Sequence, residues 1–528
     1  MTFQGKPAVS LPSGFLLQLC LALAAGAVGV LAFAPLYFWP LAPVSLWVLF
    51  SLWYRSATTW RAFALGFAWG LGLFTAGVSW IYVSLHVYGN MPALLAGVAT
   101  LLFCAYLALY PALAGALTRT LVVRLGLSAT SALLVVMPAS FVAFEYLRGW
   151  VVSGFPWLSI GYSQTPGGMI PAPLTGYAAI TGVYGISWLL AIAVALVVRL
   201  TCGAAAPPLP KAQRIAMIAL LVLIAAGGSA LQQIVWSDPS GKPLSVALLQ
   251  GNIEQDLKWR DDQRTPTLAN YHQLITASQA KLIVLPETAL PDLLDRIPGE
   301  FLESIRGHAR KGGADILLGV PIADQVGGAT PHFRYANSAI SMGASTPQRY
   351  DKQHLVAFGE FVPPLFAWVY RWLQIPLADF NSRAVDSRPM HIAGHRIAIN
   401  ICYEDTFGRE IALQLPEAEL LVNISNMAWF GASLAPDQHA QMSQMRALES
   451  ARWMLRATNT GATAAIDEKG VIVRAMPAFT RGTLEVTAQP LTGATPYSRW
   501  RDTPVLVCLA ISLLSAALLR RRTSPAGR

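Results

Sequence analysis

The stretch Asn400–Phe407, NICYEDTF, decides how the soluble part of the chain is interpreted. It continues the apolar run Ile397–Ile401, which predicts a buried strand, and the apolar pattern stops at Cys402. The carboxylates Glu404 and Asp405 follow directly. A lone strand cysteine is usually a core residue, but a thiol at the end of a buried strand, followed by carboxylates, indicates a functional site.

Two earlier stretches place charged side chains at the ends of predicted strands. Leu285-Pro286-Glu287 ends in a carboxylate, and Tyr350-Asp351-Lys352 ends in an ammonium group. A carboxylate can remove the proton of a thiol, and a neighbouring cation favours the thiolate and stabilises an oxyanion. Glu287, Lys352 and Cys402 therefore form a coherent set for acyl transfer without a histidine. Taken singly, each has an ordinary alternative: a turn residue after proline, a solvated lysine and a core cysteine.

The composition is that of a membrane protein. The 528 residues are 54% hydrophobic and only 12% charged, whereas about a quarter of the residues of a soluble domain are charged. The net charge is +10, but the basic residues are scattered or flank apolar segments. We therefore assign the positive charge to membrane flanks and expect no nucleic-acid partner.

Eight apolar windows approach the length of about 20 residues that a helix needs to cross a bilayer. Lys and Arg fall on alternate connections between them, and the positive-inside rule then places both termini in the cytoplasm. We expect a transmembrane domain at 1–235, a periplasmic catalytic domain at 236–502, and a last helix with a basic tail at 503–528, all in the inner membrane of a Gram-negative bacterium. The windows are 14–33, 37–54, 62–85, 92–117, 128–147, 175–198, 213–235 and 503–519.

The loop 148–174 lies on the same side as the catalytic block and is rich in aromatic and turn-forming residues. It holds Gly154-Phe155-Pro156-Trp157 and Gly161-Tyr162-Ser163-Gln164. One interpretation is an interfacial aromatic belt. The other is a short element that lines a lateral entrance to the active site, with Trp157 in it.

Strand and helix patterns alternate along the block 236–502, which predicts an α/β domain in which sheets are layered with helices. The expected strands are 244–250, 282–285, 316–320, 335–342, 347–352, 396–401 and 420–424, and the expected helices are 263–279, 299–312 and 436–456.

The same block contains no pattern that requires a cofactor. Cys402 is its only cysteine, which excludes a disulfide framework. His391 and His395 are spaced like a metal pair, but Gly394 predicts a hairpin between them and no third ligand is evident, so we expect no metal. No Walker-type glycine loop is present, so no nucleotide is implied.

Three motifs resemble the nitrilase superfamily of carbon–nitrogen hydrolases: LPET at 285–288, DKQHLVAFGEFVP at 351–363 and NICYEDTF at 400–407. Shorter matches lie at 250–259 and 446–459. The resemblance implies an α-β-β-α sandwich that carries a Glu–Lys–Cys triad. Together with the eight spans and the stretch FPWLSIGYSQ, the chain is similar to the membrane-embedded branch of that superfamily, the apolipoprotein N-acyltransferases.

This resemblance assigns roles to the strand-end residues. Cys402 is the expected nucleophile, Glu287 the general base and Lys352 the cation that stabilises the oxyanion. The residues expected to support the active site are Glu360, Tyr403 and Glu404.

The resemblance also places Trp259 and Trp429 in mobile loops over the entrance; the alternative for both is plain anchoring in the interface. For Tyr403 the alternative is packing beside the nucleophile. Two residues depart from the family pattern: Met427 stands where Asp is common, and Ala357 stands where Pro is common. Neither belongs to the triad, so the departures concern loop geometry and lipid preference.

By the resemblance, Cys402 takes an acyl chain from a phospholipid, the sn-1 chain of phosphatidylethanolamine, and forms a thioester. The N-terminal amine of a diacylglyceryl-cysteine on an apolipoprotein then takes the chain, in a ping-pong reaction of a monomeric enzyme. One alternative is a membrane-tethered amidase whose thioester is resolved by water. Another is a transporter with a passive soluble domain, but the spans hold almost no ionisable residues at mid-depth.

Overall fold

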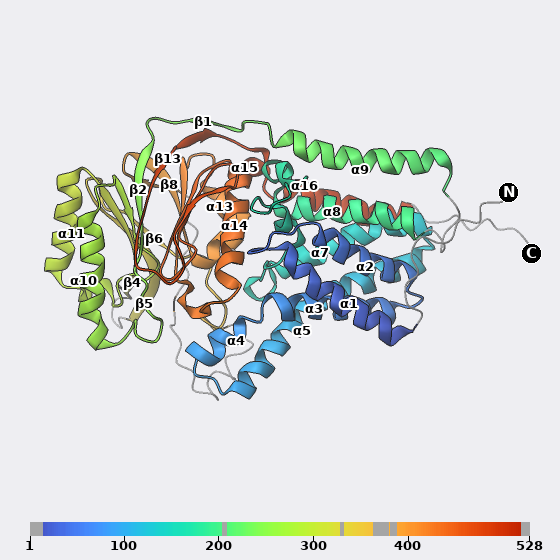
Figure 1. Ribbon diagram of the computed structural model, residues 1–528, viewed down its shortest axis with the longest axis horizontal. Helices are drawn as coiled ribbons and strands as arrows, with labels where there is room; N and C mark the ends of the chain where they lie inside the picture. Colours follow the sequence, from blue (N-terminus) through green and yellow to red (C-terminus); the bar gives the residue numbers. More distant parts are fainter. Residues whose placement is uncertain (1–13, 203–208, 328–331, 363–379, 381–387, 519–528) are drawn as a thin grey trace, which may run out of the picture. The chain divides into compact units, whose positions relative to one another are not determined.

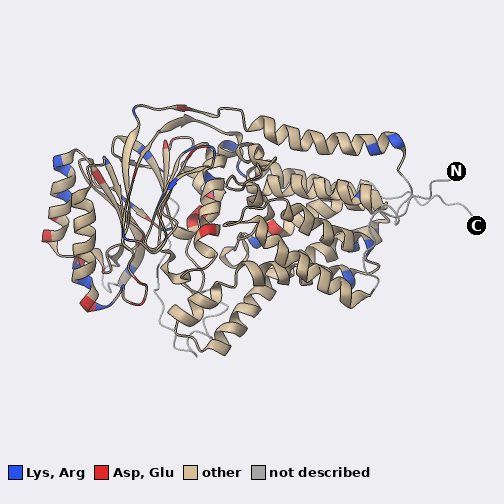
Figure 2. Cartoon of the chain, viewed as in Figure 1, with Lys and Arg blue, Asp and Glu red and all other residues tan. Residues whose placement is uncertain are grey.

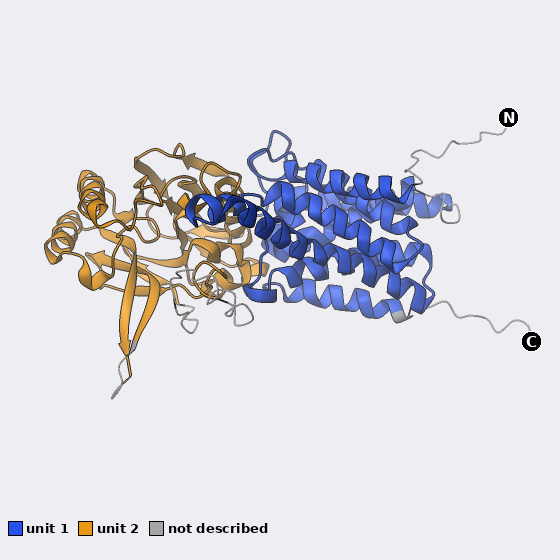
Figure 3. Cartoon of the chain, turned by 90° about the horizontal axis from the view of Figure 1, so that it is seen from below, with its two compact units in different colours: residues 1–234, 500–528 blue, residues 235–499 orange. Residues whose placement is uncertain are grey.

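The computed structural model of the protein describes residues 14–202, 209–327, 332–362, 380 and 388–518 (Figure 1). The chain divides into two compact units, shown in different colours in Figure 3. Unit 1 comprises residues 1–234 and 500–528, and unit 2 comprises residues 235–499.

Unit 1 is helical, and every predicted span contains at least one helix. A sixth candidate span is obtained if α3 (Thr59–Gly77) and the segment Ile81–Tyr88, bent by 57°, are counted as one. α2 (Leu41–Arg55) and α16 (Thr503–Leu518) have 15 and 16 residues, fewer than the about 20 of a straight crossing. The count of eight spans therefore remains a prediction. Within the described ranges, five segments are long and apolar enough to cross a membrane: Phe15–Ala32, Ala93–Leu125, Ala129–Arg148, Thr175–Thr201 and Lys211–Leu231.

The long helices of unit 1 carry few charged residues along their length (Figure 2). Two of them, α3 and α5 (Ala93–Leu125), approach each other closely at glycines. A Cβ atom on Gly66 would lie 2.5 Å from the carbonyl oxygen of Pro111, and one on Gly70 would lie 2.9 Å from Cα of Ala108. Any larger residue would force these helices apart, which is the small-residue packing typical of membrane helices.

Unit 2 contains two six-stranded sheets with helices on their outer faces (Figure 1). The elements are β2 (Leu244–Gln250), α10 (Asp261–Ala277), β3 (Leu282–Val284), α11 (Gly299–Gly312), β4 (Asp315–Val326), β5 (His332–Gly343), β6 (Arg349–Asp351), β7 (Met390–Ile392), β8 (His395–Ile401), β9 (Leu420–Ser425), α14 (Ala435–Ser450), β10 (Met454–Thr458), β11 (Ala464–Ile466), β12 (Ile472–Ala475) and β13 (Gly482–Ala488). The strand orders are β13-β2-β3-β4-β5-β6 and β12-β11-β10-β9-β8-β7. In each sheet the three strands that lead to the site, β2-β3-β4 and β8-β9-β10, are parallel.

The core lies in three layers because neighbouring strand residues point to opposite faces. Val246 of β2 and Ile399 of β8 belong to the apolar cluster between the two sheets. Ala247 instead packs in the outer cluster with residues of α10 and α11. Ala398 packs with Ala447 of α14 on the other outer side. This arrangement confirms the expected α-β-β-α sandwich.

The helix predicted over 436–456 is wrong at its C-terminal end. α14 ends at Ser450, where Ala451 adopts a left-handed conformation with φ +49°. Met454–Thr458 is instead strand β10, which pairs in parallel with β9 and is buried throughout. A strand buried on both faces shows no polar alternation, so its apolar residues extend a helical pattern equally well.

Candidate active site

Cys402 directly follows β8 and begins a short 3-10 turn, Cys402–Thr406. Its backbone has φ +53°, a left-handed conformation that is costly for a residue with a side chain. Glu404 fixes the turn, because its Oε2 accepts a hydrogen bond from the backbone N–H of Ile401 at 2.7 Å. The carbonyl of Cys402 accepts from Nδ2 of Asn423 at 3.1 Å. These bonds hold the thiol, which is partly buried, at the carboxyl end of the strand.

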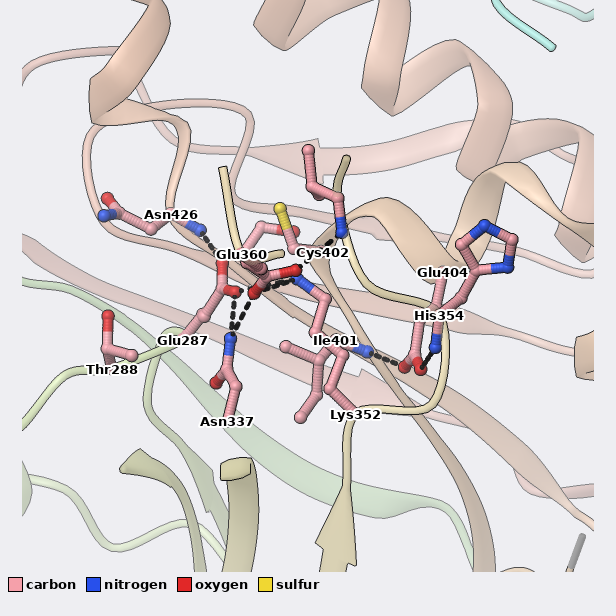
Figure 4. A network of polar contacts seen from close by, with 12 residues as sticks. Glu287, Thr288, Asn337, Lys352, His354, Glu360, Ile401, Cys402, Glu404 and Asn426 are labelled. Carbon is pink, nitrogen blue, oxygen red and sulfur yellow. Dashed lines mark hydrogen bonds and ion pairs between the residues drawn. The ribbon is translucent and has the colours of Figure 1, made fainter. Parts of the chain in front are cut away.

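Glu287 lies in the loop after β3, and both of its carboxylate oxygens accept hydrogen bonds (Figure 4). Oε1 accepts from Nδ2 of Asn337 at 2.7 Å and from Nζ of Lys352 at 3.2 Å. Oε2 accepts from the backbone N–H of Asn426 at 2.9 Å. Burial alone would raise the pKa of Glu287, but Lys352, the amide of Asn337 and a second lysine, Lys258, hold it below its ordinary value. Glu287 is therefore ionised in the resting site.

Lys352 follows β6 and bridges two carboxylates. Its Nζ donates to Oε1 of Glu360 at 2.9 Å as well as to Glu287. Its side chain is almost completely buried, which opposes the charge, but the two carboxylates raise the pKa of Lys352 well above its ordinary value. The site thus contains a permanent cation.

The thiol of Cys402 is protonated at rest. Burial raises its pKa, and the negative charges of Glu287 and Glu360 raise it further against the effect of Lys352. The negative charge of Glu287 acts on the thiol, and Figure 4 shows both side chains in the same polar network. Because an ionised carboxylate shares the site with a protonated thiol, the proton can move to Glu287 as sulfur attacks an electrophile. The arrangement suits covalent attack on a carbonyl carbon.

Glu360 belongs to the same network as the three strand-end residues. Its Oε1 accepts from Lys352 and, at 3.0 Å, from Nδ2 of Asn337. Its Oε2 accepts from the backbone N–H of Val356 at 2.8 Å. Asn337 therefore donates to both Glu287 and Glu360, so one carboxamide fixes the separation of the two carboxylates.

Glu404 connects the nucleophile turn to the segment that carries Lys352. Its Oε1 accepts from the backbone N–H groups of Gln353 at 2.6 Å and His354 at 3.1 Å. Its Oε2 accepts from the hydroxyl of Tyr350 at 2.9 Å. The buried carboxylate thereby fixes the positions of Lys352 and Cys402 relative to each other.

Tyr403, which follows the nucleophile, packs against aromatic rings. Its ring centroid lies 5.3 Å from that of Phe407 and 5.9 Å from that of His354, edge-on to both. These contacts favour the packing interpretation of Tyr403.

The two tryptophans expected at the entrance are half-exposed and lie on connected segments. Trp259 is 52% exposed and Trp429 is 40% exposed. Nδ2 of Asn426 donates to Oε1 of Gln255 at 2.7 Å, which ties the segment before Trp429 to the segment before Trp259. A gating role for either tryptophan remains a prediction.

Trp157 belongs to unit 1 and is buried there. Its ring lies 5.1 Å from that of Trp80 and 5.8 Å from that of Phe155, measured between centroids. Packing of this kind is not that of a lipid-facing aromatic belt. A role for Trp157 at a substrate entrance remains a prediction.

Sequence reasoning missed three residues of the site: Asn337, Asn426 and Lys258. Asn426 follows β9 as Cys402 follows β8, so the strand-end rule that selected the cysteine would also have selected this asparagine. Asn337 is a carboxamide inside a predicted strand, where a buried amide needs polar partners. Lys258 lies in the short family match at 250–259, but a lysine is almost always solvated, so its residue type alone does not indicate a buried site residue.

The two departures from the family pattern lie beside the site. Met427 is buried, and its Sδ lies 3.3 Å from Nδ1 of His439. Nε2 of that histidine is 2.5 Å from Oδ1 of Asp405. Ala357 forms an isolated β-bridge with Phe361 in the loop between Lys352 and Glu360.

The expected hairpin at Gly394 is confirmed, since β7 and β8 are antiparallel with His391 and His395 on opposite sides of the turn. Nδ1 of His395 lies 3.5 Å from Oε2 of Glu419. Among the residues that the structure describes, no group of three or more His, Cys, Asp or Glu side chains could hold a metal ion.

Comparison with known proteins relates both units to the same enzymes. The family model described as "Apolipoprotein N-acyltransferase N-terminal domain" matches residues 25–196, and the one described as "Carbon-nitrogen hydrolase" matches residues 245–497. An apolipoprotein N-acyltransferase of Nitrosomonas europaea is 43% identical over 512 residues, which cover 96% of this chain and 99% of that protein. The chain belongs to the apolipoprotein N-acyltransferase family. It is therefore an enzyme, an N-acyltransferase with a carbon–nitrogen hydrolase domain, and a membrane protein.

A second bacterial relative agrees with this assignment. An apolipoprotein N-acyltransferase of Ralstonia nicotianae is 44% identical over 508 residues, which cover 95% of this chain and 93% of that protein. Among solved structures, a variant of the Nesterenkonia AN1 amidase from the nitrilase superfamily covers 51% of this chain and 98% of its own, with 15% identity and a TM-score of 0.35.

Proposed function

We propose that the enzyme transfers an acyl chain from a phospholipid to the N-terminal amine of an apolipoprotein through a thioester on Cys402. The observation that carries this proposal is the pairing of a protonated thiol with an ionised carboxylate, Glu287, which is itself hydrogen-bonded to the cation Lys352. A thiol and a carboxylate whose pKa values are displaced in opposite directions are poised for one proton transfer during attack.

In the first half-reaction, Sγ of Cys402 attacks the ester carbonyl while its proton moves to Glu287. Lys352 stabilises the oxyanion of the tetrahedral intermediate, an effect worth about 3–4 kcal/mol when such a donor is well placed. The C–O bond of the ester then breaks, and Glu287 returns the proton to the leaving alkoxide. The products are a thioester on Cys402 and a lysophospholipid.

In the second half-reaction, the amine of the acceptor attacks the thioester carbonyl. Glu287 removes a proton from the attacking nitrogen, and Lys352 again stabilises the oxyanion. The C–S bond breaks as the amide forms, and the proton on Glu287 passes to the sulfur. The enzyme is then ready for another phospholipid, which is a ping-pong cycle.

The finer assignments are part of the same proposal: the sn-1 chain of phosphatidylethanolamine as the donor, a diacylglyceryl-cysteine as the acceptor, and a monomeric enzyme. Counting α2 and α16 as spans gives eight crossings, seven of them before unit 2. With the Lys and Arg bias of the loops, this supports cytoplasmic termini and a periplasmic unit 2 in the inner membrane.

The test uses the purified full chain in detergent with a labelled phospholipid. We expect an acyl adduct on Cys402, detected by mass spectrometry, that persists until an N-terminal cysteine lipopeptide is added and then disappears. The variant Cys402→Ala should form no adduct. An adduct that water removes without an acceptor would contradict acyl transfer and favour an amidase.

A further inference from the structure

A second buried lysine, Lys258, contacts the turn that carries the proposed base. It is 2% exposed. Its Nζ donates to Oγ1 of Thr288 at 2.6 Å and to the carbonyl oxygen of Glu287 at 3.3 Å. Lysines are almost never fully buried without a specific partner, and the proposed mechanism gives this one no role.

The first consequence of these contacts concerns the backbone. Thr288 has φ +45°, a left-handed conformation that is rare for a β-branched residue. Lys258 bonds the carbonyl before this residue and the hydroxyl on it, so it holds the strained turn from both sides. Because the turn directs the side chain of Glu287, Lys258 orients the base.

The second consequence concerns charge. Glu287 and Glu360 carry two negative charges, and Lys352 carries one positive charge. Lys258 brings this group to neutrality. The nearby pair of Asp405 and Arg456, with an N–O distance of 2.6 Å, is balanced separately.

Burial lowers the pKa of Lys258 to about 8, against the opposing effects of Glu287 and Cys402. These two groups act on the ammonium electrostatically, and Glu287 is in turn paired with Lys352, which also binds Glu360. When sulfur gives its proton to Glu287, the negative charge moves from the carboxylate towards sulfur, and both ends of that transfer interact with Lys258.

We infer that Lys258 is a positioning residue of the acyl-transfer site, which holds the turn of Glu287 and supplies a second cation beside that base. This inference deepens the proposed function and rests on the same nucleophile. It also places the residue next to Trp259 in the chain, so the segment that carries that exposed tryptophan delivers the cation to the site.

The test measures alkylation of Cys402 by iodoacetamide in the detergent-solubilised full chain. In this reaction a C–S bond forms, iodide leaves and the thiol proton passes to Glu287. An opposite charge within a few ångströms shifts a pKa by about 1–3 units, so we expect Lys258→Met to slow alkylation about tenfold or more near neutral pH. Lys242→Met, at an exposed lysine of the same unit, should leave the rate unchanged.

The pH profile separates an electrostatic role from a structural one. In the native chain Lys258 loses its proton above about pH 8, so the difference from Lys258→Met should shrink above that pH. Lys258→Arg keeps the charge and should retain the faster rate there. Thr288→Val removes one hydrogen bond but keeps the cation, so any deficit should be independent of pH.

A deficit in Lys258→Met that is the same at every pH would overturn the electrostatic role, and no deficit would overturn both roles. Iodoacetamide needs no lipid, so the outcome does not depend on the donor. If alkylation depends on Lys258 but no phospholipid adduct forms, the proposed donor fails and the role of Lys258 stands.

Discussion

Two networks of buried charge act on Cys402 and use similar side chains for different functions. The site network consists of Glu287, Lys352, Glu360 and Asn337. The scaffold network consists of Asp405, Arg456, His439 and Ser443. The carboxylates of the site network are 8% and 12% exposed, whereas Asp405 and Arg456 are completely buried.

In the scaffold network both carboxylate oxygens of Asp405 have side-chain partners. Oδ2 of Asp405 accepts from Arg456 at 2.6 Å and from Ser443, and Oδ1 pairs with His439 at 2.5 Å. Although burial opposes it, His439 and Arg456 hold the pKa of Asp405 below its ordinary value, and burial lowers the pKa of His439. No protonation step of the proposed reaction involves these groups.

The site network differs because it acts on the thiol of Cys402, a group that can change its protonation state. The carboxylate of Glu287 is held ionised while the pKa of the Cys402 thiol is raised. The two states of this carboxylate–thiol pair therefore differ by the position of a single proton. Buried ion pairs therefore indicate chemistry only where one partner can change its protonation state. Variants of the two networks should therefore fail in different ways.

The largest effect is expected from Glu287→Gln, which preserves volume but removes the base. General acid–base catalysis contributes about 10²–10⁴-fold, so formation of the acyl adduct on Cys402 should slow by about that factor. The thermal unfolding midpoint should change little, because Lys352 keeps Glu360 as a partner. A rate within about tenfold of the native value would show that another group takes the proton.

Arg456→Met should produce the opposite pattern. Removing one partner of a buried ion pair costs about 3–5 kcal/mol, because Asp405 is left buried without its cation. Urea unfolding of the detergent-solubilised chain should show this loss. Formation of the acyl adduct by the folded protein should slow far less than in Glu287→Gln, even though Arg456 also interacts electrostatically with Cys402. Equal losses of rate in the two variants would erase the distinction between the networks.

The sequence predicts the residues of the site network better than those of the scaffold network. Glu287 and Lys352 lie at strand ends of one sheet and Cys402 at a strand end of the other, and the two sheets pack face to face, so selecting residues at strand ends finds all three. Asp405 stood in the same quoted stretch, but its partners lie on α14 and β10, 34 and 51 residues further on. Such pairings follow from how helix and sheet pack, which the local pattern does not contain.

The predictions of the fold were likewise correct for some strands and wrong for others. β2 and β10 are both buried on both faces. The turn signal Gly251-Asn252 bounds β2, whereas β10 follows the helical pattern of α14 and is predicted as its continuation. Lys258 was missed because burial of a lysine is a property of the assembled site. Neither the residue type nor the spacing of Lys258 predicts that its side chain is buried.

Asn337→Ala weakens the site network without removing any of its charges, because Asn337 donates hydrogen bonds to both Glu287 and Glu360. A hydrogen bond to a charged group is worth about 1.5–3 kcal/mol, so adduct formation should slow by about ten- to a hundredfold. The amide helps to hold the pKa of Glu287 below its ordinary value, so its loss should raise that pKa. The acid limb of the rate profile should then move to higher pH.

The same shift in the pKa of Glu287 should change how the stability of the protein depends on pH. A carboxyl whose folded pKa is depressed stabilises the protein above its unfolded pKa, about 4.3 for Glu, and this contribution is lost as pH falls through the folded pKa. Asn337→Ala should therefore lose stability at a higher pH on acidification than the native chain. An unchanged acid limb would mean that Lys352 alone keeps Glu287 ionised.

The smallest effects on the fold are expected at the half-exposed tryptophans, which belong to neither network. Surface substitutions usually change stability by no more than about 0.5 kcal/mol, so Trp259→Ala and Trp429→Ala should unfold like the native chain. Alkylation by iodoacetamide should also be unchanged, because this reagent needs only the thiol and its base. Phe479→Ala, at another exposed aromatic of unit 2, serves as the matched control.

A difference should appear only with a lipid donor. If the two tryptophans admit or hold the acyl chain, their variants should raise the phospholipid concentration needed for half-maximal adduct formation, while Phe479→Ala should not. If all three variants behave alike, the tryptophans are interface anchors. The site network would then define the chemistry of Cys402, and recognition of the lipid would lie elsewhere in the chain.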